Sequence, residues 1–401
     1  MTQTHKILAV SPGITTTKIA VFEDGHKLYA ETIEHTPEIL GEFGEPQSQL
    51  PFRTEAVLAA VGRSGVRLEE ISLFAGRGGG LLGLVGGTYE VDGTILDHAS
   101  RGMPGPHPAQ LGSQIVNDLA KLVGGRAFIV NSPDTDELQD LARPTGFSDI
   151  FRIGATHALS QKEVAARYCQ AEGVKYGEVN LIVCHIGGGL SVTAHRKGMM
   201  VDSNNILGGD GPMAPNRAGT LPAIQFMRLC YGGKVTQKEM ERRLTRAGGL
   251  AEHLGTYDGR EIERRIKAGD RYAALVYDAM IYQVGKTVGE MACAQKGEVR
   301  AILLTGDLAR SAYLVSTLKG YVGWIAPVVA MPGEFEMEAL AAGALRVAQG
   351  LEEGKKYSGK ARWEGFEHLK GDGHPPHPDP PGFAPPAEGQ TAQAKGPFGQ
   401  A

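Results

Sequence analysis

Two stretches of the chain share one pattern of strands and glycine turns. The first, ILAVSPGITTTKIAVFEDGHKLYAETIE, begins at Ile7, and the second, LIVCHIGGGLSVTAHRKGMMVDSNN, begins at Leu181. Each pattern predicts an apolar strand, a turn containing Gly13 or Gly187, a second strand, a turn made of a charged residue and glycine, and a third strand. Two antiparallel meanders at matching places in two halves predict a duplicated domain.

The first turn of each meander has two interpretations. The segment SPGITTTK, residues 11–18, can be a plain β-hairpin turn. Small residues and hydroxyl groups at such a turn also leave backbone N–H groups and Oγ atoms free to bind phosphate. The segment alone favours the plain hairpin, so further motifs have to decide.

Composition excludes several classes of function. The chain has 401 residues, of which 42% are apolar, and a net charge of −4. This charge creates no field that would recruit nucleic acid or an anionic membrane. The sequence contains no apolar run of the ~20 residues that span a bilayer, and no signal-peptide pattern. Four cysteines without CxxC spacing argue against a zinc site or disulfide framework. We therefore expect a soluble, cytoplasmic protein.

The composition changes near Gly354, where the sequence becomes rich in proline. Proline fixes φ and removes a hydrogen-bond donor, and few large apolar residues remain. We therefore expect residues 357–401 to form a disordered tail. The tail contains His368, His374 and His377, and the prolines among them argue against a metal site.

The segments between the meanders are helical in pattern, as in PAQLGSQIVNDLAKLVGG and LSQKEVAARYCQAEG. A third strand–turn–helix unit, VRAILLTGDLARSAYLVSTLKGYV, follows late in the chain. Paired hairpins with such a unit resemble the superfamily of acetate and sugar kinases, Hsp70 and actin. The resemblance implies an α/β fold of two ribonuclease-H-like (actin-like) ATPase domains with the active site in the cleft between them. Residues 1–165, completed by a helix in 334–355, and residues 166–333 are the expected domains. An ordinary α/β protein with many glycine turns is the alternative.

Polar residues gather in short segments between these elements. Arg77 lies in FAGRGGGL, His107 in RGMPGPHPAQLG, Asp136 in NSPDTDEL, His157 in GATHALSQK and Arg217 in GPMAPNRAGT. Each has a structural interpretation, for example a helix cap or a solvated loop charge.

Together these motifs resemble the acetate kinase family, and most closely its members that phosphorylate butyrate. The resemblance covers roughly residues 6–355 and rests on the order GRGG, HPAQLG, DTDEL, THALSQK, HIGGGLSV, NRAGT, LLTGDLARS and PGEFEMEALAAGALR. It implies reversible transfer of the γ-phosphoryl group of ATP to butyrate. The carboxylate is already ionised at neutral pH, so the reaction needs cations, donors and a metal rather than a base.

The resemblance also implies roles for single residues. Arg77 would hold the substrate carboxylate, because a planar guanidinium matches two oxygens. Arg217 and His157 would stabilise the transferring phosphoryl group, with His107 nearby. Asp136 corresponds to the catalytic aspartate of the family, which positions the site and helps to hold magnesium.

Nucleotide and Mg²⁺ sites are implied in the same way. The expected metal residues are Asp136, Glu336 and Ser11, with Glu338 as the alternative to Glu336. The residues expected at ATP are Ser11, Gly13, Thr15, Thr17, Lys18, His185, Gly187, Gly188, Gly189, Thr305, Gly306 and Asp307. The first hairpin departs from the family, which usually has Asn-Pro-Gly-Ser where this chain has Ser11 and Ile14.

The size of the acid is inferred from further departures. The residues expected to bind the acid are Arg77, Gly78, Gly79, Pro106, His107 and Thr156. Acetate kinases carry bulkier apolar residues at the positions of Gly78, Gly79, Pro106 and Thr156, so we expect a wider pocket. Each extra buried methylene contributes ~0.8 kcal/mol, which favours a four-carbon acid. Isobutyrate and isovalerate are the alternatives.

Three other functions remain open. A sugar kinase of the same fold would use Asp136 as its base, an actin-like or Hsp70-like protein would bind a partner, and a family member with altered Ser11 and Ile14 would be less active. We also expect a homo-oligomer, with LPAIQFMRLCYGG as a candidate interface segment.

Overall fold

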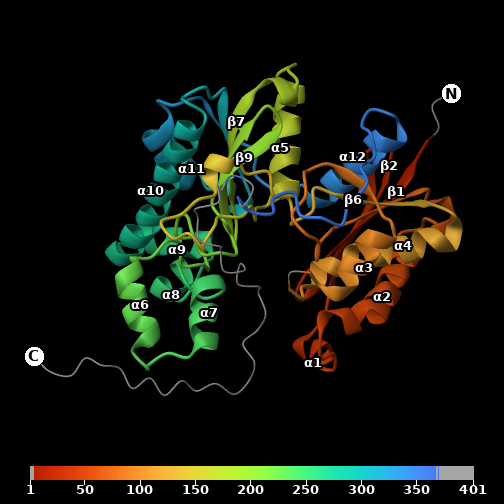
Figure 1. Cartoon of the computed structure of the whole chain (residues 1–401), viewed down its shortest axis with the longest axis horizontal. Coiled ribbons are helices and arrows are strands. Elements are labelled where there is room, and N and C mark those ends of the chain that lie inside the picture. Colours follow the sequence, from red (N-terminus) through yellow and green to blue (C-terminus); the bar gives the residue numbers. More distant parts are fainter. Residues whose placement is uncertain (1–3, 104, 367–368, 370–401) are drawn as a thin grey trace, which may run out of the picture.

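Two mixed sheets form the framework of the chain in the computed structural model, which describes residues 4–103, 105–366 and 369. Figure 1 shows the N-terminal sheet with its helices on the right and the C-terminal sheet with its helices on the left. The helix α12 (Glu336–Ala348) returns to the N-terminal half. The two halves therefore face each other across the middle of the molecule.

The N-terminal sheet has six strands in the order β3-β2-β1-β4-β6-β5. The strand β1 pairs antiparallel with β2 and parallel with β4. The six strands are β1 (Lys6–Pro12), β2 (Thr16–Glu23), β3 (His26–Glu34), β4 (Leu73–Gly76), β5 (Thr88–Glu90) and β6 (Arg126–Val130).

The C-terminal sheet has five strands in the order β11-β10-β7-β8-β9. Here β7 pairs antiparallel with β8 and parallel with β10, so it occupies the place that β1 has in the first sheet. The strands are β7 (Asn180–Ile186), β8 (Leu190–Arg196), β9 (Met199–Ser203), β10 (Ala301–Thr305) and β11 (Val328–Ala330). The predicted duplication of a three-stranded antiparallel meander is confirmed.

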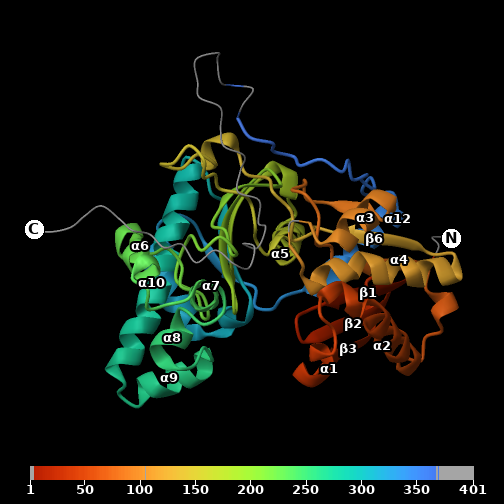
Figure 2. The same cartoon turned by 60° about the horizontal axis from the view of Figure 1, so that its bottom comes forward.

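The helices cover the faces of these sheets (Figures 1 and 2). In the N-terminal half they are α1 (Pro37–Gly41), α2 (Leu50–Arg63), α3 (Gly93–Arg101), α4 (Leu111–Val123) and α12. In the C-terminal half they are α5 (Ala158–Ala171), α6 (Ala223–Tyr231), α7 (Gln237–Thr245), α8 (Leu250–Leu254), α9 (Gly259–Lys267), α10 (Arg271–Ala294) and α11 (Ala312–Val322). Within the described ranges, none of these helices is long and apolar enough to cross a membrane.

Each sheet is packed on both faces, which explains its continuous apolar strands. In the N-terminal half, α2 and α4 cover one face and α12 covers the other. The small residues of α12 allow it to lie close to the sheet: a Cβ atom on Gly343 would be 2.5 Å from Val130. In the C-terminal half, α10 and α11 cover one face and α5 the other.

Two expected boundaries differ from the structure. The predicted division at residue 165 falls inside α5, whose Val164 and Ala165 pack on the C-terminal sheet. The first part of the predicted tail is packed rather than free. Tyr357 is buried and its hydroxyl accepts from Leu82 N at 2.9 Å, while Trp363 lies under Arg143. The tail histidines His368, His374 and His377 lie outside the described residues.

Candidate active site

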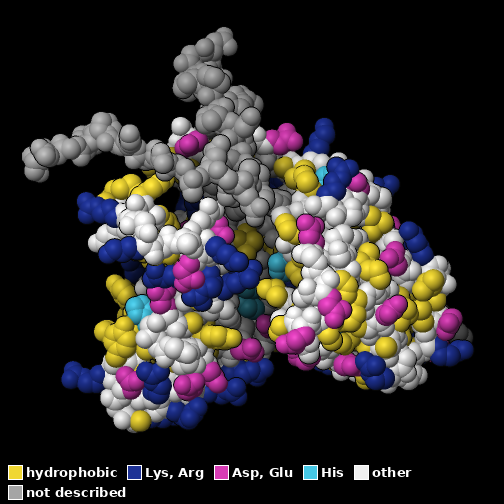
Figure 3. Space-filling model, turned by 90° about the horizontal axis from the view of Figure 1, so that it is seen from below, with side chains coloured by type: hydrophobic (Ala, Val, Ile, Leu, Met, Phe, Trp, Pro, Cys, Tyr) yellow, Lys and Arg dark blue, Asp and Glu magenta, His cyan; other side chains and the backbone are white. Residues whose placement is uncertain are grey.

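A pocket of about 250 Å³ lies between the two halves. Figure 3 shows the hollow between them, with Lys and Arg side chains gathered along its left-hand edge. The pocket is lined by Lys18, Arg77, Asn131, Pro133, Thr156, His157, Ala158, Leu159, Ser160, His185, Gly188, Gly189, Glu334 and Glu336. Residues from β2, from the ends of β4, β6 and β7, and from the beginnings of α5 and α12 therefore converge on one site.

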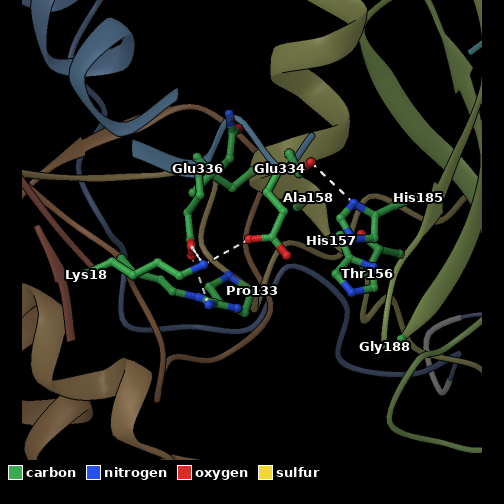
Figure 4. A pocket seen from close by; sticks show the side chains of 14 residues that line it. Lys18, Pro133, Thr156, His157, Ala158, His185, Gly188, Glu334 and Glu336 are labelled. Carbon is green, nitrogen blue, oxygen red and sulfur yellow. Dashed lines mark hydrogen bonds and ion pairs between the residues drawn. The ribbon is translucent and has the colours of Figure 1, made fainter. Parts of the chain in front are cut away.

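One wall of the pocket is a network of charges (Figure 4). Glu336 Oε1 accepts from Ser11 Oγ at 2.7 Å and from Arg77 Nη1 at 2.9 Å. Lys18 Nζ lies 2.9 Å from Glu334 Oε2 and 3.6 Å from Glu336 Oε2. Three predicted residues from distant segments, Ser11, Arg77 and Glu336, thus meet directly.

Local backbone geometry places these two glutamates. Phe335, between them, has a φ of +50° in the left-handed region, and α12 begins immediately after it. Glu336 therefore lies in the first turn of α12, where a carboxylate is favoured by the helix dipole. Burial opposes ionisation of Glu334, but Lys18 lowers the pKa of Glu334 below its usual value. In turn, Glu334 and Glu336 outweigh the effect of burial and raise the pKa of Lys18.

The opposite wall carries two stacked histidines. The rings of His157 and His185 lie 3.9 Å apart at an angle of 17°. Burial lowers the pKa of His157 well below its usual value, assisted by His185, Arg217 and Arg77. Burial also lowers the pKa of His185 to about 4, although nearby carboxylates act in the other direction. Both rings are therefore neutral at pH 7. His185 lies on β7, and His157 immediately precedes α5, whose N-terminal N–H groups favour anions.

Arg217 lies directly beneath the second glycine turn. A Cβ atom on Gly189 would be 2.2 Å from Arg217 Nη1. This Nη1 atom is buried and has no hydrogen-bond partner in the part of the chain that the structure describes, whereas Arg217 Nε donates to Thr245 O at 3.4 Å. A buried guanidinium donor without a partner is costly unless a ligand satisfies it.

The first hairpin turn is held from behind by Arg53. Its guanidinium is fully buried and donates to Thr16 O at 2.8 Å, to Ile14 O at 3.1 Å and to Thr17 Oγ1 at 2.9 Å. Thr17 Oγ1 also bonds His35 Nε2, so the expected phosphate contact from the Thr17 side chain is wrong. Thr15 is exposed, and Gly13 closes the turn by donating its N–H to Thr16 O at 2.7 Å.

The second glycine turn and the expected adenosine segment are adjacent. Gly187 N donates to Gly189 O at 3.0 Å. Gly306 has a φ of +85°, and a Cβ atom there would be 2.5 Å from Ile186 O, so only glycine permits this approach. Thr305 Oγ1 donates to Gly333 O at 2.7 Å and is therefore engaged within the fold. Asp307 begins a short 3-10 helix outside the pocket lining.

The predicted widening of the acid pocket by Gly78 and Gly79 is wrong. A Cβ atom on Gly78 would be 2.7 Å from Ser132 Oγ, and one on Gly79 would be 3.0 Å from Gln110 N. Protein atoms already fill this space, so the two glycines permit close packing and leave no room for a larger acid. Thr156, in contrast, does line the pocket.

The other two residues predicted to bind the acid lie beside the pocket. Pro106 and His107 are absent from the pocket lining, and His107 Nδ1 accepts from Ala109 N at 3.1 Å. Partial burial, with Arg77 and Arg246 nearby, lowers the pKa of His107 to about 4. His107 is thus within electrostatic reach of Arg77 without lining the same pocket.

Asp136 does not reach the pocket, which corrects its predicted role. Both of its carboxylate oxygens accept from the buried guanidinium of Arg143, at 2.8 and 3.0 Å. Its neighbour Glu137 is likewise paired, with Lys162 at 2.9 Å. Asn131 and Pro133, which follow β6, do line the pocket, and Asn131 has a φ of +41°.

Asn131, Glu334 and Ser160 line the pocket but were not predicted as site residues. Glu334 stands two residues before Glu336, and the PGEFE segment signals both. Asn131 follows directly on the apolar strand FIV, which is the usual place for a functional side chain in an open α/β sheet.

The carboxylates of the pocket can hold magnesium only together with the phosphates of a nucleotide. Among the described residues no cluster of three or more His, Cys, Asp or Glu side chains could hold a metal alone. Glu334 and Glu336 supply two carboxylates in one pocket, and Mg²⁺ is commonly held by one or two carboxylates together with substrate phosphates and water. Asp136, which is bound to Arg143, is outside this set.

Comparison with known proteins identifies similar chains. A family model described as the acetokinase family matches residues 142–319. Two curated relatives from Clostridium botulinum, strains Alaska E43 and Eklund 17B, are each named probable butyrate kinase. Each is 41% identical over 353 residues, which cover 88% of this chain and 99% of the relative.

Solved structures show the fold. Acetate kinase from Porphyromonas gingivalis matches with a TM-score of 0.70 at 19% identity, covering 86% of this chain and 100% of that one. A propionate kinase from Francisella tularensis matches with a TM-score of 0.66 at 15% identity, covering 84% of this chain and 98% of that one. The predicted fold class is confirmed.

Proposed function

This chain belongs to the acetokinase family, and from that premise we propose that it transfers the γ-phosphoryl group of ATP to butyrate and, in reverse, from butyryl phosphate to ADP. It is a phosphotransferase with a carboxyl group as acceptor. The choice of butyrate is supported by the two relatives named probable butyrate kinase.

The observation that carries this proposal is the free donor of Arg217 beside Gly189. Its Nη1 atom is buried without a partner in the described part of the chain, and the neutral His157 ring and Arg77 line the adjacent pocket. A phosphoryl group in transfer carries negative charge on its equatorial oxygens. Donors that are already fixed around such a group lower the barrier without reorganisation.

Each residue then has a definite task. Arg77 uses only Nη1, on Glu336, for a side-chain bond within the described residues, so its other N–H groups are available to the acid carboxylate. Arg217 and His157 donate to the phosphoryl oxygens. The N–H groups of Gly188 and Gly189 and the first turn of α5 receive the nucleotide phosphates. No base is required, since the attacking carboxylate is ionised at pH 7.

Glu334 and Glu336 are the residues that would hold magnesium. When bound, Mg²⁺ would neutralise phosphate charge and orient the β- and γ-phosphoryl oxygens. Lys18, which now bridges the two glutamates, would then be released towards the phosphates.

The pocket weighs against a sugar kinase. That reaction needs a carboxylate to deprotonate a hydroxyl group, and the predicted candidate, Asp136, is bound to Arg143. A branched-chain acid kinase and a less active family member are the remaining alternatives. The second is favoured by Ile14, which is 54% exposed at the tip of the first hairpin, where the family has a hydroxyl.

We place the reaction in the cytoplasm, where ATP is available, and in a homo-oligomer. The helix α6 contains no buried residue, and Ile224 and Met227 on it are about half exposed. Contiguous exposed apolar side chains favour a protein contact at this surface.

The test is turnover on a panel of acids with MgATP and hydroxylamine, which traps acyl phosphates as hydroxamates. Acetate, propionate, butyrate, isobutyrate and isovalerate are compared by kcat/KM. The proposal predicts a maximum at butyrate. A maximum of kcat/KM at a branched acid would show that the substrate is that acid rather than butyrate. No turnover on any acid, while ATP still binds, would support the less active alternative.

A further inference from the structure

A chain of hydrogen bonds runs behind the pocket from Tyr176 to His157, and none of the roles above uses it. Between these ends it passes through His195, Gln161 and Ser191, each of which is fully buried. Tyr176 Oη lies 2.6 Å from His195 Nδ1, and His195 Nε2 lies 3.0 Å from Gln161 Oε1. Gln161 Nε2 is 2.7 Å from Ser191 Oγ, which is 2.8 Å from His157 Nδ1.

Two elements hold this chain in place. Gln161 lies one helical turn after His157 in α5, and its backbone N–H donates to His157 O at 2.9 Å. Ser191 and His195 lie on the same face of β8, because residues separated by an even number of positions share a face of a strand. Since helix and strand are both rigid, the three central side chains, Gln161, Ser191 and His195, are held in fixed positions.

The direction of the hydrogen bonds follows from one backbone atom. The carbonyl oxygen of Ser191 can only accept, and it lies 3.2 Å from Gln161 Nε2. The NH₂ group of Gln161 must therefore face Ser191, and its Oε1 must face His195 and accept. Consequently His195 donates from Nε2, and its Nδ1 accepts the proton of Tyr176. The bond to the Ser191 carbonyl oxygen and the bond from the Tyr176 hydroxyl are both consistent with this direction.

The same reasoning fixes the proton of His157. Ser191 Oγ accepts from Gln161, and His157 Nδ1 is the other partner that its hydroxyl has within the described residues. Leaving that buried O–H without an acceptor would cost about 1–3 kcal/mol. The Ser191 hydroxyl therefore donates to Nδ1, and a neutral imidazole that accepts at Nδ1 carries its proton on Nε2.

We infer that Gln161 is a positioning residue: through Ser191 it holds His157 as the Nε2–H tautomer, so that the ring presents a donor to the pocket. The role of that donor towards a phosphoryl group rests on the proposed function. In the opposite tautomer, a nitrogen lone pair would face the phosphoryl oxygens and repel them. The network thus selects the useful tautomer before any ligand binds.

The tautomer can be measured directly on the full chain. With ¹⁵N-labelled histidine, the two imidazole nitrogens differ in chemical shift according to which one carries the proton, and His157→Gln identifies the signals. We expect the wild-type ring to be protonated on Nε2. In Gln161→Leu, Ser191 Oγ is released to accept from Nδ1–H, so we expect a mixture of tautomers. Gln170→Leu, the same change at an exposed position of α5, should leave the wild-type tautomer.

Kinetics provide an independent readout. Gln161→Leu should lower kcat by about 10- to 100-fold, because one fixed donor is partly lost, with both KM values within about two-fold. Ser191→Ala should have a similar effect, and Ser191→Thr, which keeps the hydroxyl, should restore turnover. The double variant Gln161→Leu/Ser191→Ala should be no slower than the slower single variant, since both changes break one chain.

The outcomes are distinguishable. A wild-type His157 ring protonated on Nδ1 would overturn the inference, as would a Gln161→Leu variant with unchanged tautomer and kcat. Should the wild-type chain phosphorylate no acid, the proposed function would fail, while the tautomer measurement would still decide the role of Gln161. A Gln161→Leu variant that loses its fold would show altered signals from every histidine. In that case the tautomer and kcat of Ser191→Ala test the inference.

Discussion

Arg217 and Gly189 are packed so closely that an ideal Cβ atom on Gly189 would lie 2.2 Å from Arg217 Nη1. The nitrogen occupies the space that any side chain at this turn would need, and it has no hydrogen-bond partner within the described residues. The turn therefore needs glycine for the position of the guanidinium as well as for access of phosphate to the backbone.

Gly189→Ala should displace this guanidinium. We expect kcat/KM for butyrate phosphorylation to fall by at least about 10²-fold, the usual effect of losing one donor that stabilises transition-state charge. The measurement is steady-state turnover, with Gly289→Ala as the control, because nothing lies within 4 Å of a Cβ atom there. Equal turnover of both variants would show that the position of the Arg217 guanidinium beside Gly189 does not contribute to the reaction.

Asp136→Asn should affect stability more than catalysis. Breaking a buried ion pair by changing one partner costs about 3–5 kcal/mol, and Arg143 has both of its terminal nitrogens on Asp136. We expect urea unfolding at lower concentration for Asp136→Asn and for Arg143→Met, with kcat of the folded protein within a few-fold of wild type. If Asp136→Asn lowered kcat at unchanged stability while Arg143→Met did not, Asp136 would have a catalytic role after all.

Arg53→Met should loosen the first hairpin turn. The change removes donors from Thr16 O and Ile14 O, which are the backbone groups that shape the turn. We expect the KM for ATP to rise by about 10-fold, equivalent to about 1.4 kcal/mol of lost binding, with a smaller change in kcat. Arg63→Met is the matched control at an exposed position of the same helix, and it should leave the KM for ATP unchanged.

Asp134 makes stability depend on pH. Burial raises its pKa to about 7 from its ordinary value of 3.8, although Ser132 Oγ donates to it at 2.7 Å. Between these values the folded state binds more protons than the unfolded state, so stability falls as the pH rises from about 4 to about 7.

Asp134→Asn should remove this dependence. The difference in Tm between variant and wild type should grow over that range and remain constant above pH 7, whereas Asp149→Asn, at an exposed position of the next loop, should show no such trend. A difference that does not change with pH would contradict the raised pKa of Asp134.

The architecture could be predicted because its signals are local. Alternating apolar strands and glycine turns specify a meander wherever they occur, and the recurrence of the pattern at Gly13 and Gly187 indicates two copies. The return of α12 to the N-terminal sheet was expected from the family resemblance, and its packing depends on Gly343 beside Val130.

The direction of a side chain is not local, and here prediction failed. A carboxylate after a strand has the same sequence signature whether it faces a cleft or an arginine, so Asp136 could not be separated from a site residue before Arg143 was seen beside it. The two glycines after Arg77 likewise suggested a wider pocket, but Ser132 and Gln110 from other segments fill the space beside them. Asn131 and Glu334 were missed for the same reason.

The central claim is that a carboxylate oxygen attacks the γ-phosphorus of ATP, and isotope transfer tests it most directly. Butyrate labelled with ¹⁸O in both carboxylate oxygens is incubated with MgATP and hydroxylamine. Attack on the γ-phosphorus would place one labelled oxygen between the acyl carbon and phosphorus, and hydroxylamine would then release phosphate carrying one ¹⁸O, together with ADP and hydroxamate. Label in AMP, or unlabelled phosphate without hydroxamate, would contradict the account.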